Sequence, residues 1–176
     1  MIRAIGRRKL KARIGVVVSD NARAYALNRA LAAKIPAVLV DPRRYTSREA
    51  FDRALAAVVR KAGVKLIVLA GFMRILSPWF VRRYRGKILN IHPALLPAFP
   101  GTRAVRDALA HRVKVTGVTV HFVDEKVDHG PIILQEIVPV RRGDNEETLL
   151  ARLHQVEHRI YPQAIQSVLQ GKVKMR

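Results

Sequence analysis

The sequence has 176 residues, of which 49% are hydrophobic and 26% charged. This composition excludes a disordered chain and predicts a single folded domain over residues 1–176. The absence of cysteine excludes disulfide bonds and thiolate metal ligands, and it suits a cytosolic protein. The apolar runs are too short to span a membrane, and the basic first residues lack the apolar stretch of a secretory signal.

The net charge is +20. A charge of this sign and size fits nucleic-acid binding, an anionic small substrate, or simply an arginine-rich solvated surface. The longest basic cluster, residues 7–13, is short and has no interleaved aromatic residues. No helix-turn-helix, zinc-finger or RNA-recognition signature accompanies it. A basic nucleic-acid-binding protein is therefore the non-enzyme alternative rather than the main hypothesis.

Short apolar runs predict strands, and apolar residues spaced three and four apart predict helices. In chain order we expect a basic helical segment at 1–11, a strand at 13–19, a helix to about 34, a strand at 35–40, a helix at 46–62, a strand at 65–70, a helix at 77–84, a strand from 88, a helix at 102–111, strands at 115–123 and 132–140, and a long helix from 144 to about 171. Strands that alternate with helices in the first half predict a parallel, Rossmann-like α/β sheet.

Several helix starts have a candidate cap. We expect Asp20 or Asn21 to cap the second helix, Thr46 the third and Asp144 the last, because short polar side chains accept hydrogen bonds from free amides. Ser77 is followed by proline, the residue favoured at the first helical position, so a helix should begin there.

Residues 88–101 hold the first candidate site. The stretch begins as an apolar strand, and Asn90 and His92 interrupt it two residues apart, so both side chains should point the same way. Three prolines follow by residue 100 and predict a stiff loop. A carboxamide and an imidazole at the carboxyl end of a strand occupy the usual place of a site in an α/β sheet. A polar strand end with a hydrogen-bonded histidine explains the pattern equally well.

A second candidate lies at residues 127–131, where Asp128 precedes a Gly-Pro turn. The carboxylate can be a turn residue, or it can pair with His92 and favour the charged imidazole. Asn90, His92 and Asp128 together would supply an oxyanion donor, a proton carrier and its orienting partner. No serine or cysteine nucleophile is indicated. No metal site is expected, since no His-Glu-x-x-His spacing is present. Only His154 and His158 are four residues apart, and Glu157 between them is not at the second position of that motif.

Five motifs resemble the phosphoribosylglycinamide formyltransferase family: AGFMRILSP at 70–78, NIHPALLP at 90–97, TVHFV at 119–123, VDHGPII at 127–133 and QVEHRIYP at 155–162. The resemblance covers nearly the whole chain. It implies a Rossmann-like, three-layer formyltransferase fold with a mostly parallel sheet and antiparallel C-terminal strands. It also implies a cytoplasmic enzyme of purine biosynthesis with small-molecule substrates and no membrane partner. A homodimer is left open.

The implied reaction moves a formyl group from the co-substrate 10-formyltetrahydrofolate to the amine of glycinamide ribonucleotide. Asn90 and protonated His92 would hold the oxyanion, and Asp128 would keep His92 charged. The resemblance implies folate contacts from Arg48, Met73, Arg74, Ile75, Leu76, Asn90, Asp124, Glu125, Lys126, Val127 and Asp128. It implies nucleotide contacts from Pro93, His154, Gln155, Val156 and Glu157, and no metal. Met73, Ile75 and Leu76 fit a hydrophobic core equally well.

The sequence departs from the family pattern in two places. Ala94 replaces a serine, which is a minor change. Relative to the family, residue 1 falls inside the first helix, so we expect the strand and phosphate-binding loop before it to be absent. We then expect residues 1–12 to be poorly fixed or recruited into an intermolecular contact, and folate to bind better than the nucleotide. Formyltetrahydrofolate hydrolase and methionyl-tRNA formyltransferase are the alternatives within the fold; the second carries an additional C-terminal domain.

Overall fold

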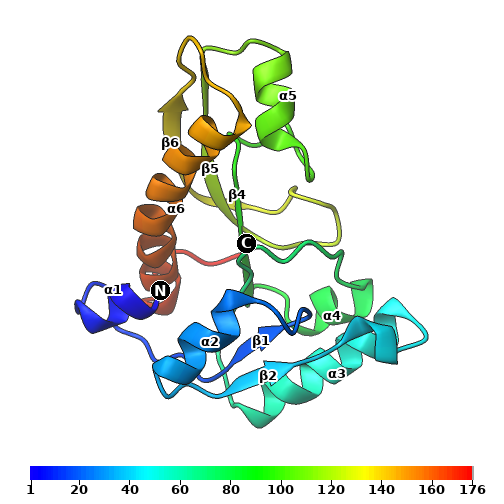
Figure 1. The fold of residues 1–176 in the computed structure, drawn as a ribbon. Helices are drawn as coiled ribbons and strands as arrows, with labels where there is room; N and C mark the ends of the chain where they lie inside the picture. Colours follow the sequence, from blue (N-terminus) through cyan, green and yellow to red (C-terminus); the bar gives the residue numbers. More distant parts are fainter. Residues whose placement is uncertain (176) are drawn as a thin grey trace.

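The strands of the computed structural model, which describes residues 1–175, form two separate sheets (Figure 1). In the first sheet, β1 (Val17–Ser19) pairs in parallel with β2 (Ala37–Leu39). The second sheet has the order β3 (Ile67–Val68), β4 (Ile88–His92), β5 (Val115–Phe122) and β6 (Ile132–Pro139). β3 and β4 are parallel, whereas β5 is antiparallel to both of its neighbours. This confirms the predicted α/β fold with antiparallel C-terminal strands.

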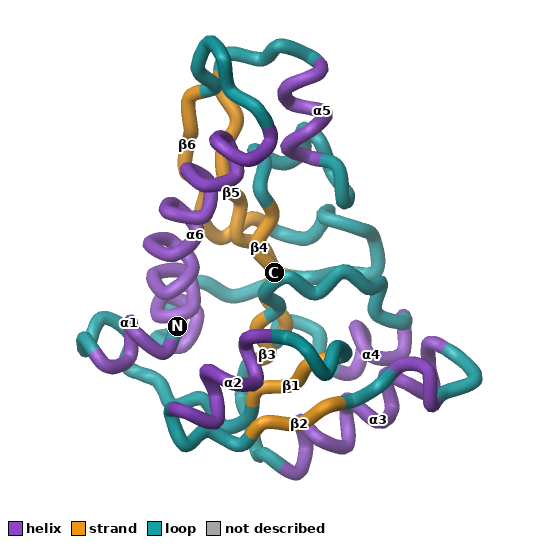
Figure 2. Tube along the Cα trace, viewed as in Figure 1, coloured by secondary structure: helices purple, strands orange, loops and turns teal. Residues whose placement is uncertain are grey.

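The helices cover both sheets. In chain order they are α1 (Ile2–Gly6), α2 (Tyr25–Ala32), the short 3-10 helix η1 (Pro42–Arg44), α3 (Arg48–Lys61), α4 (Pro78–Arg83), α5 (Ala104–Ala110) and α6 (Glu146–Leu169). Figure 2 shows α6 running along β4, β5 and β6, while α2 and α3 flank β1 and β2. Among residues 1–175, no helix combines the length and the hydrophobicity needed to cross a membrane.

The helix caps correct three of the four sequence predictions. Ser47, not Thr46, caps α3, and its Oγ accepts from the amide of Ala50 at 3.1 Å. Asn145, not Asp144, caps α6 through a reciprocal capping box, because Asp144 is engaged by Arg152 instead. α2 begins after Ala24, which offers no side-chain acceptor, so neither Asp20 nor Asn21 is its cap. The predicted Ser77 cap of α4 is confirmed.

Two hydrophobic clusters form the core. The first lies between the β4–β5–β6 strands and α6, and includes Phe122, Leu149 and Leu153. It also buries Leu10, and the amide of Lys11 donates to Gln166 Oε1 on α6 at 2.7 Å. The expectation that residues 1–12 are poorly fixed is therefore wrong, and its alternative, recruitment into an intermolecular contact, stays a prediction. Ala4, Ile5 and Ala12 pack against the same cluster, so several apolar side chains among basic residues anchor the segment.

The second cluster joins α3 and α4 to the start of β4 and the end of β2, through Val40, Phe51, Leu55, Phe80 and Ile88, among others. Between the two clusters, the hydroxyl of Tyr161 on α6 reaches the carbonyl oxygens of Leu69 at 2.5 Å and Leu89 at 3.1 Å. This phenol links α6 to the parallel pair β3–β4. Through Leu89 it also restrains the position of β4, the strand that carries Asn90 and His92.

Candidate active site

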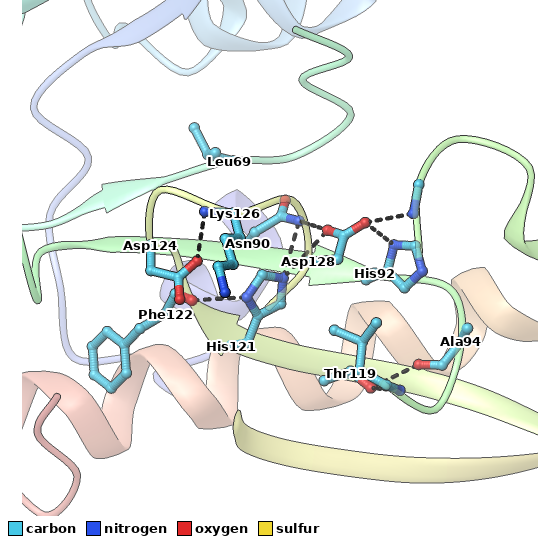
Figure 3. A network of polar contacts seen from close by, with 12 residues as sticks. Leu69, Asn90, His92, Ala94, Thr119, His121, Phe122, Asp124, Lys126 and Asp128 are labelled. Atoms are coloured by element: carbon cyan, nitrogen blue, oxygen red, sulfur yellow. Dashed lines mark hydrogen bonds and ion pairs between the residues drawn. The ribbon is translucent and has the colours of Figure 1, made fainter. Parts of the chain in front are cut away.

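Three polar side chains converge at the end of β4 (Figure 3). Asn90 and His92 are two residues apart on this strand, and Asp128 lies in the loop after β5. Asn90 Nδ2 is 3.3 Å from Asp128 Oδ1, and His92 Nδ1 is 3.3 Å from Asp128 Oδ2. The structure thus brings together the three residues that the sequence analysis singled out, although 36 positions separate His92 from Asp128 along the chain.

The loop of residues 123–131 is held so that Asp128 faces β4. A Cβ atom on Gly130 would lie 2.0 Å from the carbonyl oxygen of Phe122, so only glycine allows this close approach. Asp128 has a positive φ of 49°, a left-handed conformation that costs energy but that aspartate tolerates better than most residues. The amide of Gly101 donates to Asp128 Oδ2 at 2.8 Å and completes the support.

His92 is buried, and both of its ring nitrogens have oxygen partners. Nε2 lies 2.8 Å from the carbonyl oxygen of Phe99, which can only accept a hydrogen bond, so Nε2 must carry a hydrogen. Nδ1 faces the carboxylate of Asp128, which also only accepts when ionised. A doubly protonated ring would donate to both oxygens, and in that form it would carry a positive charge beside the amide of Asn90.

His121 is a member of the cluster that sequence reasoning did not name as a site residue. It is buried on β5 directly opposite Asn90, with Nε2 3.3 Å from Asn90 Nδ2 and Nδ1 2.8 Å from the carbonyl oxygen of Phe122. In the sequence it appeared only within the TVHFV motif. The alternation of β5 alone does not say which residue of β4 it will face. The antiparallel register between β4 and β5 places His121 opposite Asn90.

The carboxylate of Asp128 is held in its ionised form. Contact with His121, the backbone amide of Gly101 and the charge of His92 lower its pKa from 3.8 to about 2, although burial acts in the opposite direction. His121 Nε2 itself is 3.6 Å from Asp128 Oδ1, beyond ordinary hydrogen-bond length. The centre therefore contains a stable anion next to two histidines and an amide.

A cavity of about 220 Å³ lies near the start of α3 and is lined by Pro42, Tyr45, Thr46, Ser47, Arg48, Phe51, Arg74 and Ile75. It brings Arg48 and Arg74, far apart in sequence, to one place. The Arg74 guanidinium lies over the ring of Phe51, 5.4 Å from its centroid. Of the neighbouring residues expected to contact folate, Met73 and Ile75 are exposed, whereas Leu76 is buried in the second hydrophobic cluster.

The sequence of the chain matches a known protein family, described as formyl transferase, over residues 1–165. The chain belongs to the formyl transferase family.

Two relatives show which members of the formyl transferase family this chain is similar to. It is 44% identical to the phosphoribosylglycinamide formyltransferase of Escherichia coli over 167 residues, which are 95% of this chain and 79% of the relative. It is 51% identical over 164 residues to the trifunctional purine biosynthetic protein adenosine-3 of Gallus gallus. That match covers 93% of this chain but only 16% of the relative, so the chain spans about a sixth of that protein.

Solved structures agree with this assignment. The glycinamide ribonucleotide transformylase 1 of Symbiobacterium toebii superposes with a TM-score of 0.94 at 49% identity, over 97% of this chain and 80% of that one. The phosphoribosylglycinamide formyltransferase of Bacillus halodurans superposes with a TM-score of 0.93 at 38% identity, over 98% and 89%. The Rossmann-like formyltransferase fold is thereby confirmed.

The remaining residues singled out in this formyl transferase lie in three other places. In the loop before Asp128, Asp124 accepts from the amide of Lys126 at 3.0 Å, Glu125 pairs with Arg82 at 3.2 Å, and Val127 is exposed. On α6, His154 Nδ1 contacts Glu157 Oε2 at 2.7 Å, Gln155 is exposed, and Val156 packs on the first cluster. Pro93 is half-buried after β4. Within residues 1–175, no group of three His, Asp or Glu side chains is arranged to hold a metal ion.

Proposed function

We propose that the chain transfers a formyl group from 10-formyltetrahydrofolate to the amine of glycinamide ribonucleotide. The observation that carries the proposal is the contact of Asn90 and His92 with one ionised carboxylate, Asp128. The similarity to phosphoribosylglycinamide formyltransferase, which this chain matches over most of that relative's length, supports the choice of substrates.

In the proposed reaction the substrate amine attacks the formyl carbon, a carbon–nitrogen bond forms, and the carbonyl electron pair moves to oxygen. Asn90 Nδ2 donates to this oxyanion, and the His92 imidazolium places positive charge beside it. The Asn90 amide nitrogen already lies 3.3 Å from His121 Nε2 and donates to Asp128 Oδ1 at 3.3 Å. Donation to the oxyanion therefore replaces the 3.3 Å contact with Asp128, while the His121 contact keeps the amide oriented.

Asp128 serves the proton transfers of the same reaction. With a pKa of about 2 it is ionised at neutral pH, so it stabilises the His92 imidazolium and can hold a water molecule that relays protons. The attacking nitrogen loses a proton, the folate nitrogen gains one, and the bond between that nitrogen and the formyl carbon breaks. The products are the formylated amine and tetrahydrofolate.

The co-substrate is proposed to lie between residues 73–76 and the loop 124–128, with its anionic end at the cavity near α3. Two guanidinium groups, of Arg48 and Arg74, line that cavity, and guanidinium groups suit carboxylates. The backbone of residues 73–76 follows β3 and is free to hydrogen-bond the planar heterocycle. The exposed side chains of Met73 and Ile75 would be covered by the bound folate.

The nucleotide substrate is proposed to lie between Pro93 and the α6 residues His154, Gln155, Val156 and Glu157. Glu157 already holds His154 through a 2.7 Å ion pair, so its carboxylate is oriented rather than free to rotate. An oriented carboxylate suits the ammonium form in which the substrate amine arrives.

A direct assay tests the proposal. The purified chain is incubated with 10-formyltetrahydrofolate, with and without glycinamide ribonucleotide, and both formylated nucleotide and free formate are measured. Formylated nucleotide that depends on the acceptor is the expected result. Formate release that is equal without the acceptor would instead indicate a hydrolase. A salt-dependent gel shift with RNA and no formyl transfer would support the non-enzyme alternative.

A further inference from the structure

A carboxylate outside the reaction centre is almost completely buried. Asp52 lies on α3 with 1% of its surface exposed, and its Oδ2 accepts a hydrogen bond of 2.5 Å from the backbone amide of Ser77. Ser77 is itself buried and caps α4. Carboxylates are rarely placed in apolar surroundings unless a specific contact requires them, because removing the charge from water is costly. The contact that Asp52 makes is with the end of the segment that also carries Arg74.

Three consecutive residues of α3 contact residues 73–77 and the start of α4. The Phe51 ring lies beneath the guanidinium of Arg74, and Asp52 binds the Ser77 amide. The guanidinium of Arg53 lies 4.3 Å from the ring centroid of Trp79. The middle contact is the only one of the three in which both residues are buried, so it restrains the position of the backbone at Ser77 most.

The same segment shapes the cavity near α3. Arg74 and Ile75 line it from one side, and Ser47, Arg48 and Phe51 line it from the start of α3. The two walls therefore belong to elements that Asp52 joins. If the segment moved away from α3, Arg74 would separate from Arg48 and the cavity would lose its paired cations.

We infer that Asp52 is a positioning residue that fixes residues 73–77 against α3 and so sets the distance between Arg48 and Arg74. This inference rests on the proposed function, in which those two arginines bind the anionic end of the formyl donor. Asp52 touches neither substrate nor reacting atoms. It controls the affinity for the formyl donor rather than the rate of formyl transfer.

Steady-state kinetics separate these effects. Asp52→Leu keeps the side chain's size but leaves the Ser77 amide without its acceptor, so we expect KM for 10-formyltetrahydrofolate to rise about tenfold with kcat nearly unchanged, the pattern of lost uniform binding. Asp52→Asn retains an acceptor oxygen and should restore most of the affinity. Val59→Ala, in the same buried face of α3 two turns later, is the matched control for lost stability and should leave KM unchanged.

Hydrogen exchange gives a readout that needs no activity. In the unaltered chain the Ser77 amide should exchange much more slowly than that of exposed Met73, and Asp52→Leu should speed exchange at Ser77 but not within β4. The emission of Trp79, the single tryptophan, should shift in Asp52→Leu and not in Val59→Ala. An equal KM increase in Asp52→Leu and Val59→Ala would overturn the inference. So would fast exchange at Ser77 in the unaltered chain. Absence of formyl transfer by the unaltered chain would defeat the proposed function while exchange and fluorescence still tested the anchor.

Discussion

The two sheets of this chain differ in how completely they are covered. Seven of the eight residues of β5 are buried, and the 24-residue helix α6 packs along that sheet. In β1 and β2 no residue is fully buried, and the adjoining helix α2 has eight residues with only Ala30 buried. Asn90, His92 and His121 all belong to the well-covered sheet. The proposed reaction centre thus lies where side chains have the least freedom, and the less buried sheet contributes none of its three residues on strands.

The difference has a consequence for local stability. Regions with few buried apolar contacts open at lower free energy than a packed core. β1 and β3 each form the edge of a sheet, with no strand pairing between them in residues 1–175, so their outer backbone groups are available to a further strand. Function and stability should therefore divide between the two sheets as their packing indicates, and four measurements can test this division.

The largest expected effect is on catalysis. Asn90→Ala removes the proposed oxyanion donor from the well-covered sheet, and kcat should fall by about 10²–10³, the usual cost of losing one such donor. Asn28→Ala, on the exposed face of α2, is the matched control and should leave kcat unchanged. Comparable loss in both variants would show that Asn90 has no special role.

The next effect is on folding. Leu153→Ala removes a completely buried side chain from α6 and should lower the free energy of unfolding by about 2–5 kcal/mol. Leu27→Ala, the corresponding change at a half-buried residue of α2, should cost clearly less. Urea unfolding measures both, and equal losses would mean that the two sheets form one unit of stability.

A smaller effect depends on pH and on Asp128. Its pKa is about 2 in the folded chain against an ordinary 3.8, chiefly through its contact with His121, so its contribution is present above pH 3.8 and is lost as the pH falls towards 2. The stability difference between the unaltered chain and Asp128→Asn should therefore shrink over that interval. Urea midpoints from pH 5 to pH 2 measure it. A difference that stays constant with pH would show that the carboxylate gains nothing from its neighbours.

The smallest effect concerns surface charge. Arg106 and Glu146 join α5 to α6 through a 2.9 Å contact between exposed side chains. Arg106→Gln should cost about 0.2–1 kcal/mol, as exposed pairs usually do. Arg142→Gln, which removes an exposed cation that forms no ion pair among the described residues, is the control. A loss as large as that of Leu153→Ala would mean that charge, not packing, stabilises the well-covered sheet.

The sequence predicted the order and type of the elements because apolar spacing depends on local residues. It predicted that Asn90 and His92 share a side because strand alternation has a period of two. The position of His121 depended on the register between β4 and β5, which neither strand specifies alone. The burial of Leu10 and the hydrogen bond from Lys11 to Gln166 depended on residues of α6 more than 150 positions away. Thr46 and Ser47 are adjacent hydroxyl residues, and the cap was decided by where α3 begins.

Tyr161, the phenol that links α6 to β3 and β4, also limits the stability of the folded chain in alkaline solution. Its complete burial raises the pKa of the hydroxyl well above the ordinary value of 10.0, and the charge of Glu157 adds to the shift. An unfolded chain releases that proton at the ordinary value, whereas the folded chain must keep it. Between pH 10 and the raised pKa of the folded chain, each further unit should therefore favour unfolding, by at most about 1.4 kcal/mol from this one side chain. Base would unfold this chain by drawing a proton from its interior.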